Sequence, residues 1–277
     1  MTKTTRYATF YSLAACLIVI SIWLYSRISD SSSVLVVATH EHLASQEEPQ
    51  NFSKPSRALS REVREIGRSV SGRIISATLS GDAKKYVLVL AGIHGDEPSS
   101  VVLAQALASS LEGAPIPSNI SVVIVSRVNP DGLISGTRVN SRGVDINRNF
   151  PTKSWQPDAS GKRYYPGKEP ASEPETQAII RLIRKFPPWL LINIHVPLGC
   201  INWDGPAENI AKIMARSNGY PLRSNIGYPT PGSLGTYAGI ERNIPTITLE
   251  LRAAASAELI QENLPALRAA LMHIADF

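Results

Sequence analysis

The alternation of apolar, β-branched segments with helical segments is the feature that most constrains the fold. It begins near Leu59 and continues to the C-terminus. The segments expected as strands are 72–79, 86–92, 120–128, 189–195 and 244–251, and those expected as helices are 98–111, 172–186, 206–218 and 256–275. Continuous apolar strands that alternate with helices are typical of a sheet covered on both faces. We therefore predict one α/β domain over 59–277, with a mixed, mostly parallel central sheet flanked by helices.

Local signals mark the limits of two of the expected helices. Ser172 is a candidate N-cap, with Pro174 in the first turn and Glu175 three residues beyond the cap. Gly219 follows the pattern of 206–218 and is the residue type that most often ends a helix.

An uncharged stretch, residues 7–25, precedes the domain, and Lys3 and Arg6 lie before it. At about 1.5 Å per residue, a helix over this stretch would just span the core of a bilayer. Trp23 and Tyr25 at its end suit the membrane interface, and the basic N-terminus should remain cytoplasmic. We therefore predict a transmembrane anchor over 1–27, which would place the rest of the chain outside the cytoplasm.

Two alternatives to a retained anchor stay open. A signal peptide cleaved during secretion would also contain such a stretch, although no clean small-residue cleavage site follows it closely. The stretch 13–16, "LAAC", resembles a lipoprotein box, but most of the apolar stretch follows Cys16. Residues 28–58, which are polar and show little periodicity, are predicted to form a stalk.

The overall composition excludes some classes of protein. Hydrophobic residues make up 43% and charged residues 18%, as in globular proteins. The net charge of +5 comes from scattered lysines and arginines rather than from a basic stripe, so we expect no nucleic-acid partner. Cys16 and Cys200 lie in such different contexts that we expect no disulfide between them.

Three polar residues with catalytic chemistry lie at or near the carboxyl ends of expected strands. His94 follows the strand 86–92, His195 ends the strand 189–195, and Glu250 lies near the end of 244–251. Because sites in α/β sheets form at the carboxyl ends of strands, we expect these side chains to lie close together.

The pair His94 and Glu97 can converge on one metal ion across the tight turn at Gly95. Catalytic zinc sites commonly use three protein ligands, and two histidines with one glutamate form one such set. The third candidate is His195, because two of the other histidines lie in the predicted stalk and His273 lies on the last helix. The alternative is that His94 is a turn residue and His195 a hydrogen-bonded core residue.

Glu250 is the candidate general base. Zinc polarises a carbonyl and lowers the pKa of water toward about 7, and hydrolysis also needs a base that is not a ligand. A carboxylate within an apolar strand is unfavourable unless it is paired or used. The alternative is a structural ion pair, for instance with Arg252.

The segment 137–151 carries several side chains suited to substrate binding. Arg148 can hold a carboxylate through two hydrogen bonds, and Asn147 can add another. Arg138 can polarise a carbonyl and stabilise an oxyanion, and Asp145 can orient an imidazole through its second ring nitrogen. A polar surface loop is the plainer interpretation of the same residues.

These motifs together resemble the zinc metallocarboxypeptidase family. In order along the chain they are "GRSVSGRII" (67–75), "HGDE" (94–97), "NPDG" (129–132), "GVDINRNFP" (143–151), "NIH" (193–195) and "TLEL" (248–251). The resemblance covers about 60–255. It implies one Zn²⁺ per chain, bound by His94, Glu97 and His195, with Glu250 as general base and Arg138 as carbonyl polariser.

The same resemblance assigns the substrate-binding residues. It implies that Asn147 and Arg148 bind a carboxylate, and that Asp145 orients His94. The mobile tyrosine that caps the substrate would be Tyr228, with Tyr237 as the alternative.

One segment departs from the family pattern. Where digestive members have a serine after the third ligand, this chain has Val196 and Pro197. The short domain, "HVPLG" (195–199) and the segment 227–251 most resemble the bacterial murein peptide amidase branch. That branch cleaves the bond between γ-D-glutamate and meso-diaminopimelate in peptidoglycan fragments.

We therefore expect a zinc-dependent hydrolase for cell-wall peptides, attached to the bacterial inner membrane by a single span with its catalytic domain facing the periplasm. A general zinc carboxypeptidase, a zinc deacylase of the succinylglutamate desuccinylase and aspartoacylase type, and an inactive peptide-binding module are the competing hypotheses. The deacylases share an early HGxE motif with this chain. The position of Arg138, nine residues before Asn147, favours the peptidase instead.

Overall fold

The computed structural model describes residues 61–113, 116–157 and 161–276. The predicted anchor and stalk lie outside these residues and remain predictions. Within the described part of the chain, we find no helix with the length and apolar character needed to cross a membrane.

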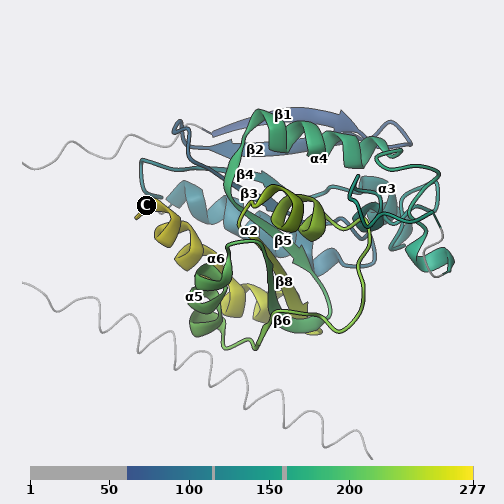
Figure 1. Cartoon of the computed structure of the whole chain (residues 1–277). Coiled ribbons are helices and arrows are strands. Elements are labelled where there is room, and N and C mark those ends of the chain that lie inside the picture. Colours follow the sequence, from purple (N-terminus) through teal and green to yellow (C-terminus); the bar gives the residue numbers. More distant parts are fainter. Residues whose placement is uncertain (1–60, 114–115, 158–160, 277) are drawn as a thin grey trace, which may run out of the picture. The chain divides into compact units, whose positions relative to one another are not determined.

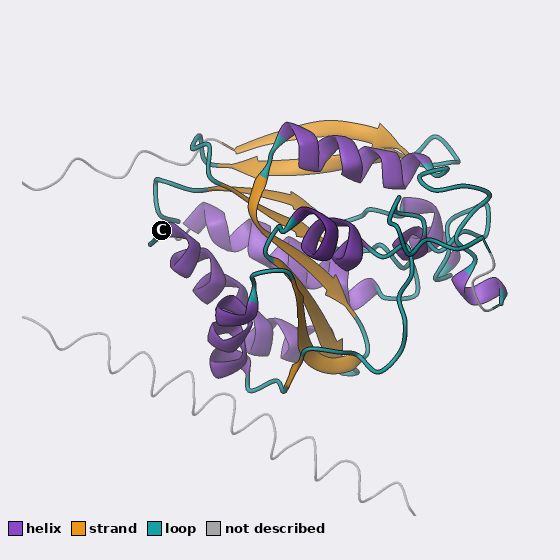
Figure 2. Ribbon diagram, in the orientation of Figure 1, coloured by secondary structure: helices purple, strands orange, loops and turns teal. Residues whose placement is uncertain are grey.

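One mixed sheet forms the centre of the domain (Figures 1 and 2). Its strands, in spatial order, are β1 (Arg61–Arg68), β2 (Ile74–Ser80), β4 (Ser121–Val125), β3 (Tyr86–Leu90), β5 (Pro188–His195), β8 (Thr246–Arg252), β6 (Leu198–Asp204) and β7 (Leu222–Arg223). The four central strands β4, β3, β5 and β8 run parallel, and antiparallel pairings join β2 to β4 and β6 to β8. The predicted mixed α/β sheet is therefore confirmed.

Helices cover both faces of this sheet, as expected. α2 (Pro98–Gly113), α5 (Glu208–Asn218) and α6 (Ser256–Ala275) pack on one face, against alternate residues such as Val87, Ile192 and Leu249. α4 (Pro174–Lys185) packs on the other face, against Leu88 and Leu191 and their neighbours (Figure 2). Both faces of the central strands are thus removed from water, which explains their continuous apolar sequences.

The sequence patterns missed the strands at the sheet margins and one helix limit. β1 is a polar, mostly exposed edge strand, and β6 follows β5 directly, so neither shows the apolar run used to recognise strands. The prediction that Ser172 caps α4 is wrong, because Glu173 occupies the cap position and Ser172 Oγ donates to Glu173 Oε1 (2.7 Å). Gly219 ends α5 in a left-handed conformation, as predicted.

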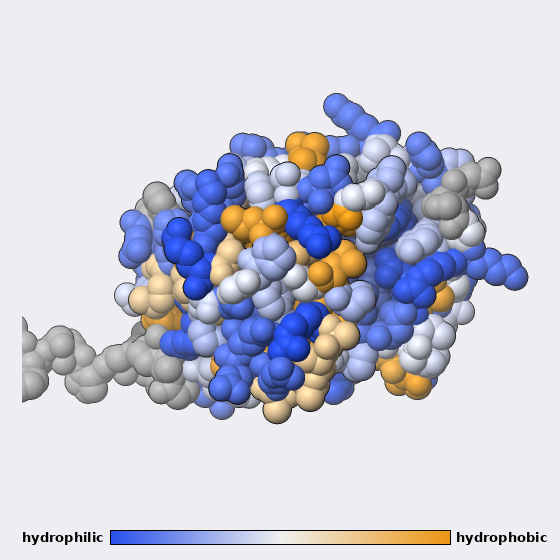
Figure 3. Space-filling view, turned by 90° about the horizontal axis from the view of Figure 1, so that it is seen from below, coloured by the Kyte–Doolittle hydropathy of each residue, from blue (hydrophilic) through white to orange (hydrophobic). Residues whose placement is uncertain are grey.

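The second face of the sheet changes from apolar to polar toward β6. Along β5, β8 and β6, the side chains alternating with the apolar ones are polar: Asn193, His195, Thr248, Glu250, Asn202 and Asp204. His195 lies opposite Glu250 in the β5–β8 ladder, and Asn202 lies opposite Thr248 in the β6–β8 ladder. All six line one cavity, whose floor is therefore the sheet itself. On the face drawn in Figure 3, hydrophilic residues predominate and hydrophobic ones are interspersed, as on most protein surfaces.

A buried carboxylate ties the β1–β2 connection to α3 (Pro130–Ser135). Asp131 is 4% exposed and accepts hydrogen bonds from Ser69 Oγ (2.8 Å), Ser71 N (2.9 Å), Arg73 Nη1 (2.7 Å) and Ser141 Oγ (3.0 Å). Burial alone would raise the pKa of this carboxyl group, but the four donors outweigh it and lower the pKa from 3.8 to about 2.

We predict that Asp131→Asn lowers the free energy of unfolding by roughly 2 kcal/mol at pH 7. Because the folded-state pKa is lowered, the stabilisation is complete above the unfolded-state pKa and is lost as the pH falls through about 2. Denaturant unfolding from pH 7 to pH 2.5 should show the difference between wild type and variant shrinking below pH 4. The exposed Asp82→Asn is the control, and an equal effect of both substitutions would contradict the assignment.

Candidate metal centre and substrate pocket

The turn that carries His94 and Glu97 lies between β3 and α2, and Gly95 lets it approach a second turn closely. A Cβ atom at Gly95 would lie 1.9 Å from the carbonyl carbon of Gly132, so no other residue fits without movement. Asn129 links the two turns, because its Nδ2 donates to Ile93 O (3.2 Å) and its Oδ1 accepts from Gly132 N (2.8 Å). The "HGDE" and "NPDG" motifs are therefore two halves of one packed unit.

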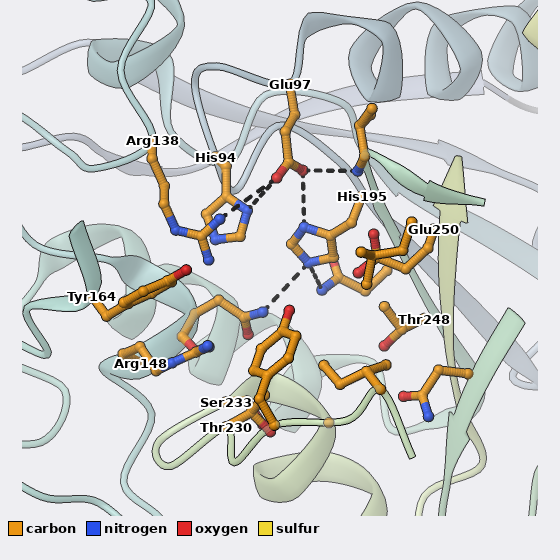
Figure 4. A pocket seen from close by; sticks show the side chains of 18 of the residues that line it. His94, Glu97, Arg138, Arg148, Tyr164, His195, Thr230, Ser233, Thr248 and Glu250 are labelled. Carbon is orange, nitrogen blue, oxygen red and sulfur yellow. Dashed lines mark hydrogen bonds and ion pairs between the residues drawn. The ribbon is translucent and has the colours of Figure 1, made fainter. Parts of the chain in front are cut away.

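The three predicted zinc ligands converge at this turn and at the end of β5 (Figure 4). His94 Nδ1 lies 2.7 Å from Glu97 Oε1, and His195 Nδ1 lies 3.0 Å from Glu97 Oε2. Potential ligand atoms of all three residues lie within 4.8 Å of one another, and all three residues are buried. The backbone N–H of Val196 also donates to Glu97 Oε2 (3.2 Å), which fixes the carboxylate against β5.

This donor set fits zinc, because two imidazole nitrogens and one carboxylate oxygen are ligands that catalytic zinc sites use. Burial alone would lower the pKa of His94, but the charges of Asp145 and Glu97 outweigh it and raise the pKa from 6.5 to about 8. Burial would likewise raise the pKa of Glu97, yet His195 and His94 hold it well below its usual range. The group is thus arranged around a carboxylate that stays ionised and attracts positive charge.

Asp145 connects the metal ligands to the substrate-binding segment. It is fully buried, and its carboxylate interacts with His94 Nε2 (3.1 Å), Arg138 Nε (2.9 Å) and the Asn147 backbone N–H (2.9 Å). Burial would raise the pKa of Asp145, but His94 and the two arginines lower it far below its usual range. The structure therefore places Asp145 where the predicted orientation of His94 requires a carboxylate.

Glu250 lies beside the candidate ligands and has no arginine partner in β8. It is 7% exposed, and burial together with the charge of Glu97 raises its pKa. The alternative that Arg252 neutralises Glu250 is wrong, because Arg252 instead forms ion pairs with Glu258 and with Glu262 (Nε–Oε2, 3.1 Å). A buried carboxylate with a raised pKa is a suitable general base.

Two arginines from the loop 137–151 reach the same cavity. Arg138 lies near Glu97 (Nη1–Oε1, 3.7 Å), and Arg148 is 5% exposed and donates to Asn147 O (2.8 Å). Burial lowers the pKa of Arg148, although a guanidinium stays charged at neutral pH. The ring of Tyr164 lies close to both guanidinium carbons, at 5.2 and 5.5 Å from its centroid (Figure 4).

The two candidate tyrosines occupy different environments. Tyr228 is 47% exposed and lines the cavity. Tyr237 is 2% exposed and packs against Phe150, with its ring under the Arg242 guanidinium. Only Tyr228 of these two therefore has the access that a substrate cap needs, and its role remains a prediction.

The cavity has a volume of about 280 Å³ and includes residues that the sequence motifs did not single out. These are Arg163, Tyr164, Asn193, Asn202, Asp204 and Thr248. The last four continue the polar alternation of β5, β6 and β8. The period-two pattern around His195 and Glu250 would have identified Asn193 and Thr248, but not the two residues of β6. Val196 and Pro197, the departure from the digestive enzymes, also line the cavity.

Comparisons with known proteins agree with this geometry. The sequence pattern of the zinc carboxypeptidase family matches residues 60–205. Murein peptide amidase A of Escherichia coli K12 is 35% identical over 210 residues, covering 72% of this chain and 84% of the relative. The Vibrio campbellii protein of the same name is 35% identical over 223 residues, covering 76% and 87%. The crystal structure of murein-tripeptide amidase from E. coli O157 superimposes with a TM-score of 0.65 at 33% identity, covering 78% of this chain and 94% of that one.

We predict that Glu250→Gln retains zinc but lowers kcat by at least about 1000-fold, since the amide cannot accept a proton. Metal analysis of the purified variant and turnover of a diaminopimelate-containing tripeptide would measure both properties. Glu169→Gln, which alters an exposed carboxylate outside the cavity, should change neither. Turnover of Glu250→Gln at the wild-type rate would remove Glu250 from its role.

Proposed function

Because the chain belongs to the zinc carboxypeptidase family, a family of peptide hydrolases, we propose that it hydrolyses an amide bond beside a free carboxylate in peptidoglycan peptides. The proposed bond joins γ-D-glutamate to meso-diaminopimelate. The names of the relatives that share about a third of their residues with this chain support the substrate class. The observation that carries the proposal is one cavity that contains the three candidate ligands, Glu250 and a buried arginine.

The reaction adds water across the amide bond, so that a C–O bond forms and the C–N bond breaks. When bound, zinc polarises a carbonyl group and lowers the pKa of water. Glu250 takes the proton from the attacking water and delivers it to the departing nitrogen. The Arg138 guanidinium stabilises the negative charge that develops on the carbonyl oxygen.

The residue released by the reaction would be held at both of its ends. Arg148 and Asn147 bind the carboxylate next to the scissile amide, and Tyr228 closes over it. The far end would meet Asp204, a half-buried carboxylate at the end of β6. Burial raises the pKa of Asp204, and within the described residues it forms no ion pair and no side-chain hydrogen bond.

Gly235 leaves room for the Asp204 carboxylate beside the cavity. A Cβ atom at Gly235, which also lines the cavity, would lie 2.2 Å from Asp204 Oδ2. Its backbone is helical, with φ −60°, so close approach rather than conformation favours glycine there. An unpaired, half-buried carboxylate is unfavourable unless a cation joins it. The second amino group of a diamino acid, which is positively charged, supplies that cation.

Digestion of a mixed muropeptide preparation, followed by mass spectrometry, tests the proposed function. Release of diaminopimelate, alone or with attached D-alanine, would support it, with Glu250→Gln as the inactive control. Release of only the terminal D-alanine would instead indicate a general carboxypeptidase. No peptide cleavage together with hydrolysis of N-acyl amino acids would indicate the deacylase.

We predict that Arg148→Ala reduces kcat/KM on the order of 100-fold for substrates with a free carboxylate beside the scissile bond. The matching amidated substrates should be affected little, because they present no charge to the guanidinium. Arg148→Lys should retain part of the preference, since it keeps the charge but loses the paired donors. An unchanged ratio between free and amidated substrates in Arg148→Ala would contradict the clamp.

We predict that Asp204→Asn reduces kcat/KM about 10- to 100-fold for tripeptides ending in diaminopimelate or lysine. A tripeptide that ends in norleucine, which has no side-chain amino group, should be hydrolysed at a nearly unchanged rate. Steady-state kinetics on the three substrates would measure this. Equal losses on lysine and norleucine substrates would show that Asp204 does not bind the amino group.

A further inference from the structure

Asn193 lies beside His195 in an unfavourable arrangement of hydrogen-bonding groups. The two residues are separated by one position on β5, so both side chains project from the same face of the sheet. Asn193 is 2% exposed, and its Nδ2 lies 2.6 Å from His195 Nε2. Its Oδ1 is buried and has no hydrogen-bond partner among the described residues.

The protonation of His195 in a metal site makes this arrangement unfavourable. Nδ1 of His195 faces Glu97, at 3.0 Å from Oε2, and is therefore the nitrogen available to a metal. A neutral imidazole that binds a metal through Nδ1 carries its proton on Nε2 and needs an acceptor there. Nε2 instead faces two donors, Nδ2 of Asn193 and Nδ2 of Asn147 (3.4 Å).

The other histidine shows what such a site requires. Nε2 of His94 lies 3.1 Å from Asp145 Oδ1, so that imidazole has an acceptor behind it. Asp145 is buried, and hydrogen bonds from Arg138 Nε and from the Asn147 backbone N–H hold it in place. Among the described residues, no carboxylate is hydrogen-bonded to Nε2 of His195. Asn193 lies there instead, and its Oδ1 can accept a hydrogen bond.

We propose that Asn193 is the positioning residue of His195, and that in the metal-loaded protein Asn193 Oδ1 accepts a hydrogen bond from His195 Nε2–H. A half-turn about the Cβ–Cγ bond exchanges Oδ1 and Nδ2, which have nearly the same shape. The exchange places the acceptor 2.6 Å from Nε2, and the buried Oδ1 gains a partner. The hydrogen bond fixes both the tautomer and the ring orientation of His195 with Nδ1 directed at the metal.

This inference rests on the three-ligand metal site and is independent of the peptide that the enzyme cleaves. The proposed role of the Asn193 side chain is also distinct from the part that the Asn193 backbone plays in the sheet. The Asn193 backbone pairs with Leu90 of β3 and Thr248 of β8, and those pairings do not depend on the side chain. A substitution of similar size therefore separates the acceptor from the strand.

The test compares the zinc dissociation constants of Asn193→Leu and Asn193→Asp with that of the wild-type full-length chain, measured by competition with a coloured chelator. Asn193→Leu removes the acceptor and should weaken zinc binding about 10- to 100-fold. Asn193→Asp keeps an acceptor at the same position and should bind zinc within a few fold of wild type. Asn202→Leu, which removes another buried carboxamide from the cavity, is the matched control and should leave zinc binding unchanged.

Two results of the zinc-binding measurement would overturn the proposal. One is zinc binding by Asn193→Leu as tight as in wild type, and the other is equal weakening in the leucine and aspartate variants. Imidazole NMR spectra of the zinc-loaded wild type and Asn193→Asp provide a measurement that does not depend on folding of the leucine variant. The His195 Nε2–H resonance should move downfield in Asn193→Asp, because a carboxylate is the stronger acceptor. An unmoved resonance would also overturn it.

Discussion

The interaction on which the rest of the site depends is the contact of one buried carboxylate with two imidazoles. Glu97 faces Nδ1 of His94 with one oxygen and Nδ1 of His195 with the other. These residues come from the β3–α2 turn and from the end of β5, so the contact joins two parts of the chain that are distant in sequence. Parallel pairing of β3 with β5 makes it possible, because it brings both carboxyl ends to the same edge of the sheet.

The cavity is a local interruption of an otherwise apolar sheet face. Over β3 and β4 this face packs beneath α4, whereas toward the carboxyl ends of β5 and β8 and along β6 it carries polar side chains that line the cavity. The charges within the cavity are separated. Arg138 and Arg148 lie near the metal ligands, and Asp204 lies at the far end of β6, where none of the described residues forms an ion pair with it. A ligand with a carboxylate at one end and an amino group at the other complements that separation.

Much of the central fold and the metal ligands could be predicted from the sequence, for a physical reason. Parallel strands buried on both faces have unbroken apolar sequences, so the segments that became β3, β4, β5 and β8 were evident. The residues that follow them, His94 and His195, then had to lie near one another. The edge strand β1 and the strand β6, which lies next to the edge strand β7, lack this signature because many of their side chains contact water or the cavity. The sequence patterns therefore did not predict them.

The parts of the site that depend on β6 and on short-range hydrogen bonds could not be predicted in the same way. Asp204 is placed by an antiparallel pairing that no sequence pattern specified. The position of Arg148 beside Tyr164 depends on how the loop 137–157 meets the short helix Lys162–Tyr164. The motifs and their spacing identified candidate residues, but only the packed structure showed which side chains each of them contacts.

Anomalous X-ray scattering, recorded above and below the zinc absorption edge on crystals of the zinc-loaded protein, tests the central claim most directly. We expect a single peak about 2.0–2.2 Å from Nδ1 of His94, Nδ1 of His195 and a carboxylate oxygen of Glu97. A peak bound to other residues or to the Nε2 atoms, or no peak between these three side chains, would contradict it.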